Sequence, residues 1–318
     1  MSVQHRRSIR IAVFAAAMFG AEAAAAQNCS VQISDMKFGS AVDTLSGAPT
    51  DTTAALTYNC SGGNPGDRLL LCVHLGDGSV PASGGYRRMM SANSYLNYQL
   101  YQTSDRTSVW GSVTNGNPPL PIAAIIENSG SASGQIRIFG RLIGGQSAAE
   151  AATYLSSFSG AHADARYRVT DDSDCASLAG MPSAAVSFNV EAVVAKDCIV
   201  ATHPVSFGSH GTLQRNVDAT GTVSVMCTPA TGYAIRLNGG NADSAPTARK
   251  MSKGSETVTY GLYRNSGRDQ PWGDTEETLA TSTSNGSHQT HIVYGRVPPQ
   301  PTPSAGTYTD TVVVTVDY

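Results

Sequence analysis

The stretch Leu96-Asn97-Tyr98-Gln99-Leu100-Tyr101 places every second side chain, Leu96, Tyr98 and Leu100, on one side of an extended backbone. A period of two is typical of a β-strand with one buried face, because successive side chains of a strand point to opposite faces. Residues 136–139 and 222–225 alternate in the same way. The chain is therefore predicted to consist of half-buried strands.

These strands belong to two copies of one pattern. The blocks of the first copy return in the same order about 170 residues further along the chain, a period too long for a solenoid repeat. The first copy contains Cys29, Phe38-Gly39, Cys60, Arg88-Met89, Tyr98 to Tyr101, Trp110-Gly111 and Phe139-Gly140-Arg141, and the second contains Cys198, Phe207-Gly208, Cys227, Lys250-Met251, Tyr260 to Tyr263, Trp272-Gly273 and Tyr294-Gly295-Arg296. This order predicts a duplicated domain.

The composition favours two β-sandwiches. The 318 residues suffice for two cores, only 14% of them are charged, and 32 are glycine. Turn signals such as Asn64-Pro65-Gly66 and Asn285-Gly286 separate the strands. We expect an all-β fold of two tandem immunoglobulin-like β-sandwich domains. Only Ser147 to Glu150 and the alanines that follow are predicted to be helical, as a capped turn or two in a loop.

Residues 1–26 have the features of a signal peptide. Three arginines precede a short apolar run, residues 11–20, and Ala24-Ala25-Ala26 offers a cleavage site before Gln27. The run is far shorter than the roughly 20 residues that span a bilayer. The net charge of −3 and the lack of a basic cluster beyond this segment argue against nucleic acid as a partner. The chain is predicted to be exported.

The six cysteines of the exported chain suggest disulfides. Six cysteines allow many pairings, and the sequence alone does not decide among them. The similar spacing of one pair in each copy favours Cys29–Cys60 and Cys198–Cys227, which leaves Cys72 for Cys175. The spacings typical of zinc ligands are absent from the sequence.

The C-terminal run makes the pattern more specific. Tyr294-Gly295-Arg296 is followed by Gly306-Thr-Tyr308-Thr-Asp310-Thr-Val312-Val-Val-Thr-Val316-Asp-Tyr318. Together with the early Cys, Phe-Gly and Cys blocks, this run resembles the spore coat protein U domain, and the resemblance covers nearly all of the chain after residue 26, twice. The first copy departs from the pattern near its end, where residues 154–158 read Tyr-Leu-Ser-Ser-Phe and the Gly-Thr-Tyr-Thr-Asp form is absent.

The resemblance implies a role in pilus assembly. That family supplies subunits of archaic chaperone–usher pili in Gram-negative bacteria, and its immunoglobulin-like folds lack the last strand. The implied partners are a periplasmic pilus chaperone, an outer-membrane usher and a neighbouring pilus subunit that donates a strand. The implied location is the cell surface, reached through the periplasm.

A donor strand is expected between the two domains. In residues 184–194, five apolar side chains stand at alternate positions, namely Val186, Phe188, Val190, Ala192 and Val194. We interpret the segment as the last strand of the first domain, supplied in cis, because a free linker does not usually alternate so strictly. The alternatives are an ordinary linker or the first strand of the second domain alone. The domains are then 27–183, an adhesin domain, and 195–318, a pilin domain, joined by the donor-strand linker 184–194.

The second domain is expected to lack its last strand. The chain stops at Tyr318, directly after Val312, Val314 and Val316, which would leave an apolar groove for β-augmentation by a partner. Cleavage after residue 26 would leave only two residues before Cys29, too few to donate to another subunit. A subunit that accepts a strand and donates none is predicted to occupy the pilus tip.

The far end of the first domain is the expected adhesive surface. In a sandwich of this kind the connections 61–67, 103–134 and 171–183 gather there, and the last two are apolar. The candidate binding residues are Pro118, Pro119, Leu120, Pro121, Ile122, Leu178 and Met181. Exposed apolar loops suit attachment to abiotic or host surfaces and biofilm formation. The alternative is that Ile122, with Ile125 and Ile126, belongs to a buried strand.

Two other functions stay open, a non-adhesive structural or initiating pilus subunit and a secreted hydrolase or lectin. The sequence contains no G-x-S-x-G, H-E-x-x-H or phosphate-loop motif, and its histidines share no ligand spacing. Asp171, Asp172 and Asp174 lack the pattern of a calcium loop. We therefore expect no enzyme, no metal and no cofactor.

Overall fold

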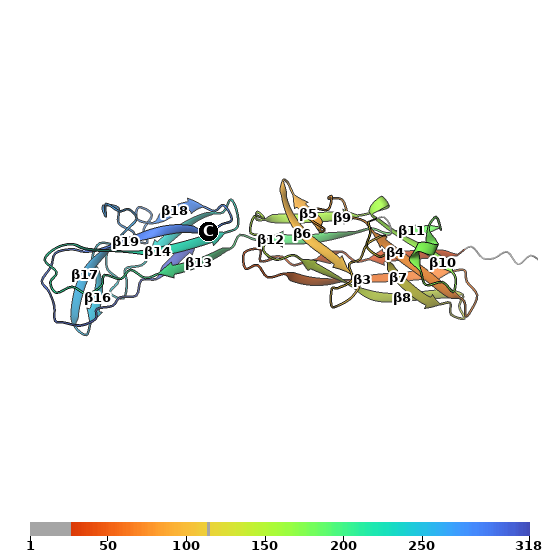
Figure 1. Ribbon diagram of the computed structural model, residues 1–318, viewed down its shortest axis with the longest axis horizontal. Coiled ribbons are helices and arrows are strands. Elements are labelled where there is room, and N and C mark those ends of the chain that lie inside the picture. Colours follow the sequence, from red (N-terminus) through yellow and green to blue (C-terminus); the bar gives the residue numbers. More distant parts are fainter. Residues whose placement is uncertain (1–26, 113–114) are drawn as a thin grey trace, which may run out of the picture.

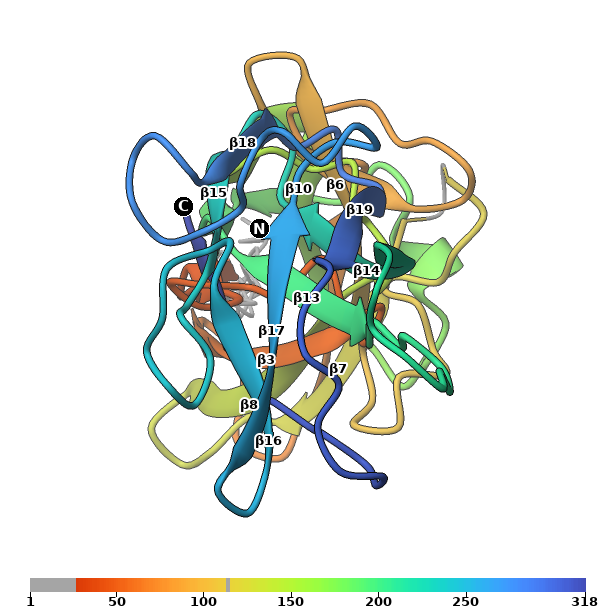
Figure 2. The ribbon, with the colours of Figure 1, turned by 90° about the vertical axis from the view of Figure 1, so that its left-hand side faces the viewer.

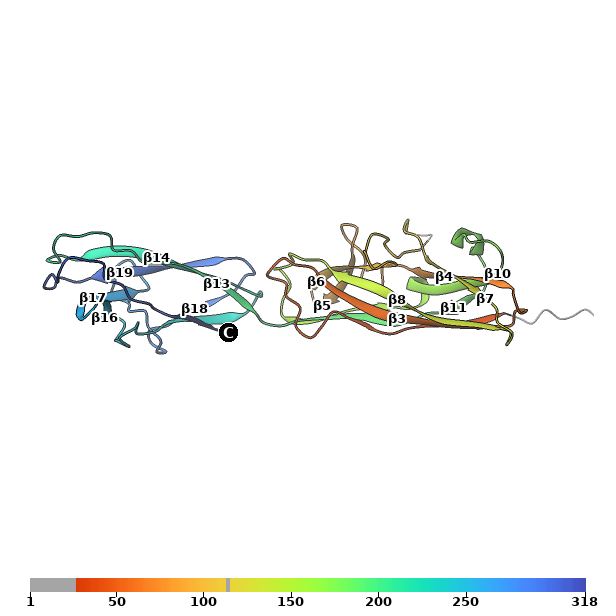
Figure 3. The same cartoon turned by 90° about the horizontal axis from the view of Figure 1, so that it is seen from below.

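The computed structural model describes residues 27–112 and 115–318, so the predicted signal peptide, residues 1–26, lies outside the described residues. Two β-sandwiches follow one another along the long axis (Figures 1 and 3). Figure 2 looks along this axis, with β14 beside β19 in the second sandwich. The predicted all-β fold of two tandem immunoglobulin-like domains is confirmed.

The first sandwich packs an eight-stranded sheet on a four-stranded one. In spatial order the larger sheet contains β1 (Asn28–Ile33), β3 (Thr50–Ser61), β8 (Ser131–Leu142), β6 (Ser94–Tyr101), β5 (Arg87–Ser91), β9 (Ala152–Phe158), β12 (Phe188–Val194) and β2 (Met36–Lys37). The smaller sheet contains β11 (Ser183–Ala185), β10 (Ala163–Val169), β4 (Arg68–Leu75) and β7 (Leu120–Ile125). Two short 3₁₀ helices flank β10, η1 (Gly160–His162) and η2 (Cys175–Leu178).

The second sandwich repeats this plan with fewer strands. Its larger sheet contains β13 (Cys198–His203), β14 (Val217–Cys227), β19 (Gln289–Val297), β17 (Glu256–Tyr263) and β16 (Arg249–Lys253), and its smaller sheet contains β18 (Ala280–Thr283), β15 (Gly232–Leu237) and β20 (Val314–Asp317). Each sandwich has its own core cluster.

The duplication extends to the core tryptophans. The indole of Trp110 donates to the carbonyl of Val73 (2.8 Å), and the indole of Trp272 donates to that of Ile235 (3.0 Å). Both side chains are almost completely buried, which agrees with the rule that a buried indole N–H finds an acceptor. Val73 on β4 therefore corresponds to Ile235 on β15.

The prediction of helix at residues 147–150 is wrong. This segment is a hydrogen-bonded turn, in which Ala149 N donates to Gln146 O (3.0 Å). The Gln146 side chain also bonds both backbone groups of Asn97, at 2.6 and 3.1 Å, and so holds the turn against β6. The alanines that follow lead into β9 instead of extending a helix.

All six cysteines form disulfides, and the pairs are the ones favoured by the spacing, namely Cys29–Cys60, Cys72–Cys175 and Cys198–Cys227. The first and third join the opening strand of each sandwich to the next long strand. Within the described part of the chain, no helix is long and apolar enough to cross a membrane.

Candidate functional site: an open groove in the second domain

The second sandwich is open along one side. A groove of about 1210 Å³ lies between residues 202–213 and residues 302–314, over the strands of the core. Eight of its apolar residues pack against the core and yet remain partly exposed, namely Val205, Phe207, Leu213, Val217, Met251, Tyr308, Val312 and Val314. The groove therefore opens onto the core of the second sandwich.

Hydrogen bonds to the β16–β17 hairpin fix one wall of the groove. Thr309 exchanges both backbone hydrogen bonds with Ser252 of β16, at 2.9 and 3.2 Å. Glu256 of β17 accepts from the backbone N–H of Ser304 (3.0 Å) and from the hydroxyl of Tyr308 (3.1 Å). The hydrogen bond from the Ser304 hydroxyl holds the pKa of Glu256 below its usual range, so this carboxylate is ionised at neutral pH.

The opposite wall is built around Phe207. Its ring meets Tyr260 edge to face, with centroids 6.0 Å apart, and its carbonyl oxygen lies 2.6 Å from a ring nitrogen of His210. Leu213 N donates to the Thr302 hydroxyl (2.9 Å), which connects the two walls. Both walls are thus ordered by contacts within the chain.

Two polar side chains of the groove, Tyr260 and Asp310, already have hydrogen-bond partners. The Tyr260 hydroxyl donates to one carboxylate oxygen of Asp310 (2.7 Å), and the other oxygen accepts from the backbone of Asn241 (2.8 Å) and Thr311 (2.9 Å). Burial, with the Asp310 contact, raises the pKa of Tyr260 well above its ordinary value. An occupant of the groove would still meet the partly exposed apolar residues of its lining.

In the first sandwich the same place is filled by β12. This strand runs antiparallel to β9, from Phe188 opposite Phe158 to Val194 opposite Ala152, and parallel to β2 at Val190. The five residues predicted for the donor strand, Val186, Phe188, Val190, Ala192 and Val194, are each at most 4% exposed. The second sandwich begins only after them, where β13 pairs with β14.

Equivalent hydrogen bonds show which residues of the two sandwiches correspond to each other. The bridge from Ser252 to Thr309 repeats the one from Met90 to Leu155. The residues at the groove, Val205, Phe207, Met251, Tyr308 and Val312, correspond to Met36, Phe38, Met89, Tyr154 and Phe158 in the first sandwich, where all five are buried. The partial exposure in the second sandwich therefore marks a missing strand.

The predicted adhesive residues do not form one exposed surface. Leu120 and Ile122 are only 8% and 7% exposed, because they lie on the inward face of β7. Leu178, the last residue of η2, is fully buried because it packs on Leu70 of β4. Pro119 is buried as well. The expectation of exposed apolar side chains is wrong for these four residues, and the strand alternative holds for Ile122.

Three of the seven candidates stay accessible. Pro118 and Pro121 are exposed and Met181 is half-buried. Pro118 O accepts from Gly111 N (2.9 Å), and Gly111 O accepts from Leu75 N (2.9 Å). Pro118 therefore lies beside Leu75, whereas the far end of the domain is at the opposite end of β4, next to Arg68. Pro118 is therefore not at the far end of the domain, contrary to expectation.

The far end itself is formed by the other predicted connections. Gly62 N donates to Gly130 O (3.1 Å), Ile126 N to Asp67 O (2.9 Å), and Thr170 N to Arg68 O (2.8 Å). These bonds gather residues 61–67, 126–130 and 170 at the end of the first domain that points away from the second domain (Figure 1). Nearby, Ile125 of β7 is 56% exposed.

Two aspartates of the 171–183 connection accept hydrogen bonds from its backbone. Asp172 accepts from Asp174 N (3.2 Å), and Asp174 accepts from Ala176 N (2.9 Å) as the N-cap of η2. Across residues 27–112 and 115–318, no group of three or more His, Cys, Asp or Glu side chains is placed to hold a metal.

Sequence reasoning did not identify Glu256 or Ser304 as part of the groove wall. The available signal was the Gly306-Thr-Tyr308-Thr-Asp310 block, which is absent from the first copy and forms this wall in the second.

Comparison with known proteins identifies a family. The family model described as Spore Coat Protein U domain matches residues 15–159 and 184–315. No curated protein sequence matches the chain. Among solved structures, the chain is similar to the CsuC-CsuE chaperone-tip adhesion subunit pre-assembly complex of archaic Csu pili from Acinetobacter baumannii, with 16% identity, 92% of this chain and 100% of that chain covered, and a TM-score of 0.55. The CupB6 tip adhesin from Pseudomonas aeruginosa has 14% identity, 92% and 94% coverage, and a TM-score of 0.41.

Proposed function

This chain belongs to the spore coat protein U domain family, and from that premise we propose that it is the adhesive tip subunit of a chaperone–usher pilus. The subunit is exported through the periplasm and displayed on the surface of a Gram-negative cell, and it is not an enzyme. The observation that carries the proposal is the difference between the sandwiches, since β12 completes the first and an open groove remains in the second. We assign residues 27–183 to the adhesin domain, 184–194 to the donor strand and 195–318 to the pilin domain.

The groove is the proposed site for a partner's strand. A strand placed like β12 would run antiparallel to residues 308–312 and parallel to residues 205–207. It would present apolar side chains at every second position, because alternate side chains face the core. The proposed occupants are first the periplasmic chaperone and then the next pilus subunit, with transfer at the outer-membrane usher.

The test of this role is capture by a periplasmic pilus chaperone. A copy of residues 184–194, joined after Tyr318 by a flexible linker, is expected to fill the groove and abolish capture. The matched control carries serine at the five alternating positions of the copy and should still be captured. Capture of both fusions alike would contradict the assignment of the groove.

The proposed adhesive surface is the outward face of β7 beside η2. Pro121, Ala123 and Ile125 face outward along this edge strand and are exposed, and Met181 is half-buried where it packs on the cluster formed by η2 and β4. The positions of Pro121 and Ala123 correspond to Thr281 and Thr283 in the second sandwich, so the fold does not require apolar side chains there. Apolar burial needs no precise receptor, which suits attachment to abiotic or host surfaces and biofilm growth.

The adhesive role is tested with Pro121→Asp combined with Ile125→Asp, because both side chains are exposed and the fold should tolerate the change. Attachment to plastic and to host cells should fall while the number of pili stays constant. Thr281→Asp is the matched control and should leave attachment unchanged. Full attachment by the double variant would favour the alternative of a non-adhesive structural or initiating subunit.

A further inference from the structure

The segment from Cys175 to Cys198 runs along most of the first domain. It starts at η2 near the far end, continues through β11 and β12, and reaches β13 of the second domain after residues 195–197 (Figures 1 and 3). A disulfide holds each end. Cys175 is bonded to Cys72 on β4, a strand with neighbours on both sides, and Cys198 is bonded to Cys227 on β14.

We propose that this segment is a covalent tie that carries tension between the far end of the first domain and the second domain. A tip subunit that holds a surface is pulled along its long axis, so the physiological use of the tie rests on the proposed function. The resistance of the tie to tension can be measured on the purified chain alone.

The geometry of β12 suits a load along the chain. Its seven residues all pair with β9, and the strand leaves the domain along its own axis. Tension at Val194 therefore loads these pairs together instead of opening them one after another. Phe188 adds a ring stack on Phe158, with centroids 4.7 Å apart, and its side chain is buried.

The disulfides set how far the first domain can extend. Residues near the start of the described chain lie at the far end, since Val169 N donates to the side chain of Gln27 (3.0 Å). Tension from there crosses the Cys29–Cys60 and Cys72–Cys175 bridges, so only residues 60–72 and 175–198 can be drawn out before Cys198. At roughly 3.4 Å per residue these segments give about 12 nm.

Optical tweezers test the tie, with handles at residue 27 and at the C-terminus of the full chain without its signal peptide. The wild-type first domain should extend to a total length of about 12 nm, so its release should be smaller than this by the length that the folded domain already spans. The double variant Cys72→Ser/Cys175→Ser frees a loop with a sequence separation of 103 and should release about 35 nm more. The control Cys29→Ser/Cys60→Ser frees a separation of 31 and should add only about 11 nm. The second domain contributes equally to all three chains.

The rupture force identifies the resisting element. Phe188→Ala on β12 should lower the force of the first-domain event more than Ile122→Ala, at a buried core residue of β7 outside the tie, when the two variants are compared at equal loss of stability. Equal loss of force in both variants, or a wild-type release far above 12 nm, would overturn the proposal. The assay uses no surface, so these results are independent of whether the chain is adhesive.

Discussion

Phe188 of β12 stacks face to face on Phe158 of β9, with the ring planes only 5° from parallel. In the second sandwich the position of Phe158 is occupied by Val312, which borders the open groove. The stack thus belongs to the strand that distinguishes the completed domain from the open one.

Phe188→Ala should lower the free energy of unfolding of the first domain by about 3–5 kcal/mol, because the change removes a buried ring and leaves a cavity. The measurement is denaturant unfolding followed by a probe in the first domain. Val200→Ala, at a residue 41% exposed in the second domain, is the control and should cost at most about 0.5 kcal/mol. A loss below about 1 kcal/mol for Phe188→Ala would show that β12 is not part of the first core.

Filling the groove should stabilise the second domain. A donor strand joined after Tyr318 would bury about five apolar side chains at roughly 1.5–3 kcal/mol each, less the cost of ordering the strand. We expect a net gain of several kcal/mol, seen as a higher melting temperature of the second domain only. The same extension with serine at the alternating positions should give little gain, and an equal gain from both would mean that the groove does not select apolar side chains.

Periodicity was sufficient to predict a strand with one buried face over residues 186–194. The strict alternation of Val186 to Val194 indicated a strand with one buried face, and the structure buries that face. The pairing of Val190 with Met36 could not be predicted, because parallel contacts between distant segments leave no local pattern.

The adhesive candidates show where a local pattern is ambiguous. Leu120 and Ile122 alternate with Pro121 and Ala123 as a strand does, but the prolines at 118, 119 and 121 suggested a loop. The structure places this segment at the edge of the sheet, where proline is tolerated. Likewise, Leu178 is buried because the Cys72–Cys175 bridge holds η2 on the outer face of β4. The sequence of a short apolar loop does not indicate that the loop packs on the outer face of a sheet.

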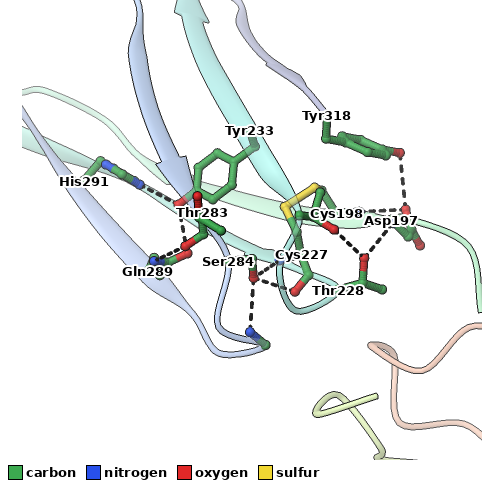
Figure 4. Close-up of a disulfide and its surroundings, with 12 residues drawn as sticks. Asp197, Cys198, Cys227, Thr228, Tyr233, Thr283, Ser284, Gln289, His291 and Tyr318 are labelled. Atoms are coloured by element: carbon green, nitrogen blue, oxygen red, sulfur yellow. Dashed lines mark hydrogen bonds between the residues drawn. A yellow bond between two sulfur atoms is a disulfide. The ribbon is translucent and has the colours of Figure 1, made fainter. Parts of the chain in front are cut away.

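His291 should make the second domain less stable in mild acid. Its ring nitrogen lies 2.9 Å from the Tyr233 hydroxyl (Figure 4), and its ring meets Tyr233 and Trp272 edge to face. Burial lowers the pKa of His291 below the ordinary 6.5, so the unfolded chain binds a proton more readily than the folded chain. The stabilising contribution is complete above the unfolded pKa and is lost as the pH falls through the folded one.

The measurement is the melting temperature of the second domain between pH 7.5 and pH 5. His291→Gln should flatten this dependence, whereas His288→Gln, at an exposed position, should leave it unchanged. An identical decline in wild type and His291→Gln would assign the acid sensitivity to other groups.

Arg249 should be among the least replaceable residues of the second domain. Its side chain is fully buried, and the guanidinium donates to the carbonyl oxygens of Asn238 (2.8 Å), Pro246 (2.7 Å), Leu237 (3.0 Å) and Trp272 (2.9 Å). Arg87 has the same role in the first domain, where it donates to the carbonyls of Gly76 (2.7 Å), Leu75 (3.1 Å) and Trp110 (2.7 Å). Only a planar fork of five N–H donors reaches so many acceptors at once.

Arg249→Lys should lower the free energy of unfolding by about 3–5 kcal/mol, because an ammonium group keeps the buried charge but leaves several carbonyls without a donor. The measurement is denaturant unfolding of the chain with its groove filled by a joined donor strand, so that the second domain unfolds cooperatively. Arg215→Lys, at an exposed position, is the control and should change stability by at most about 0.5 kcal/mol. If Arg249→Lys cost no more than this control, water or a shifted backbone would be satisfying the four carbonyls, and the fork would not be the feature that the duplicated domains preserve.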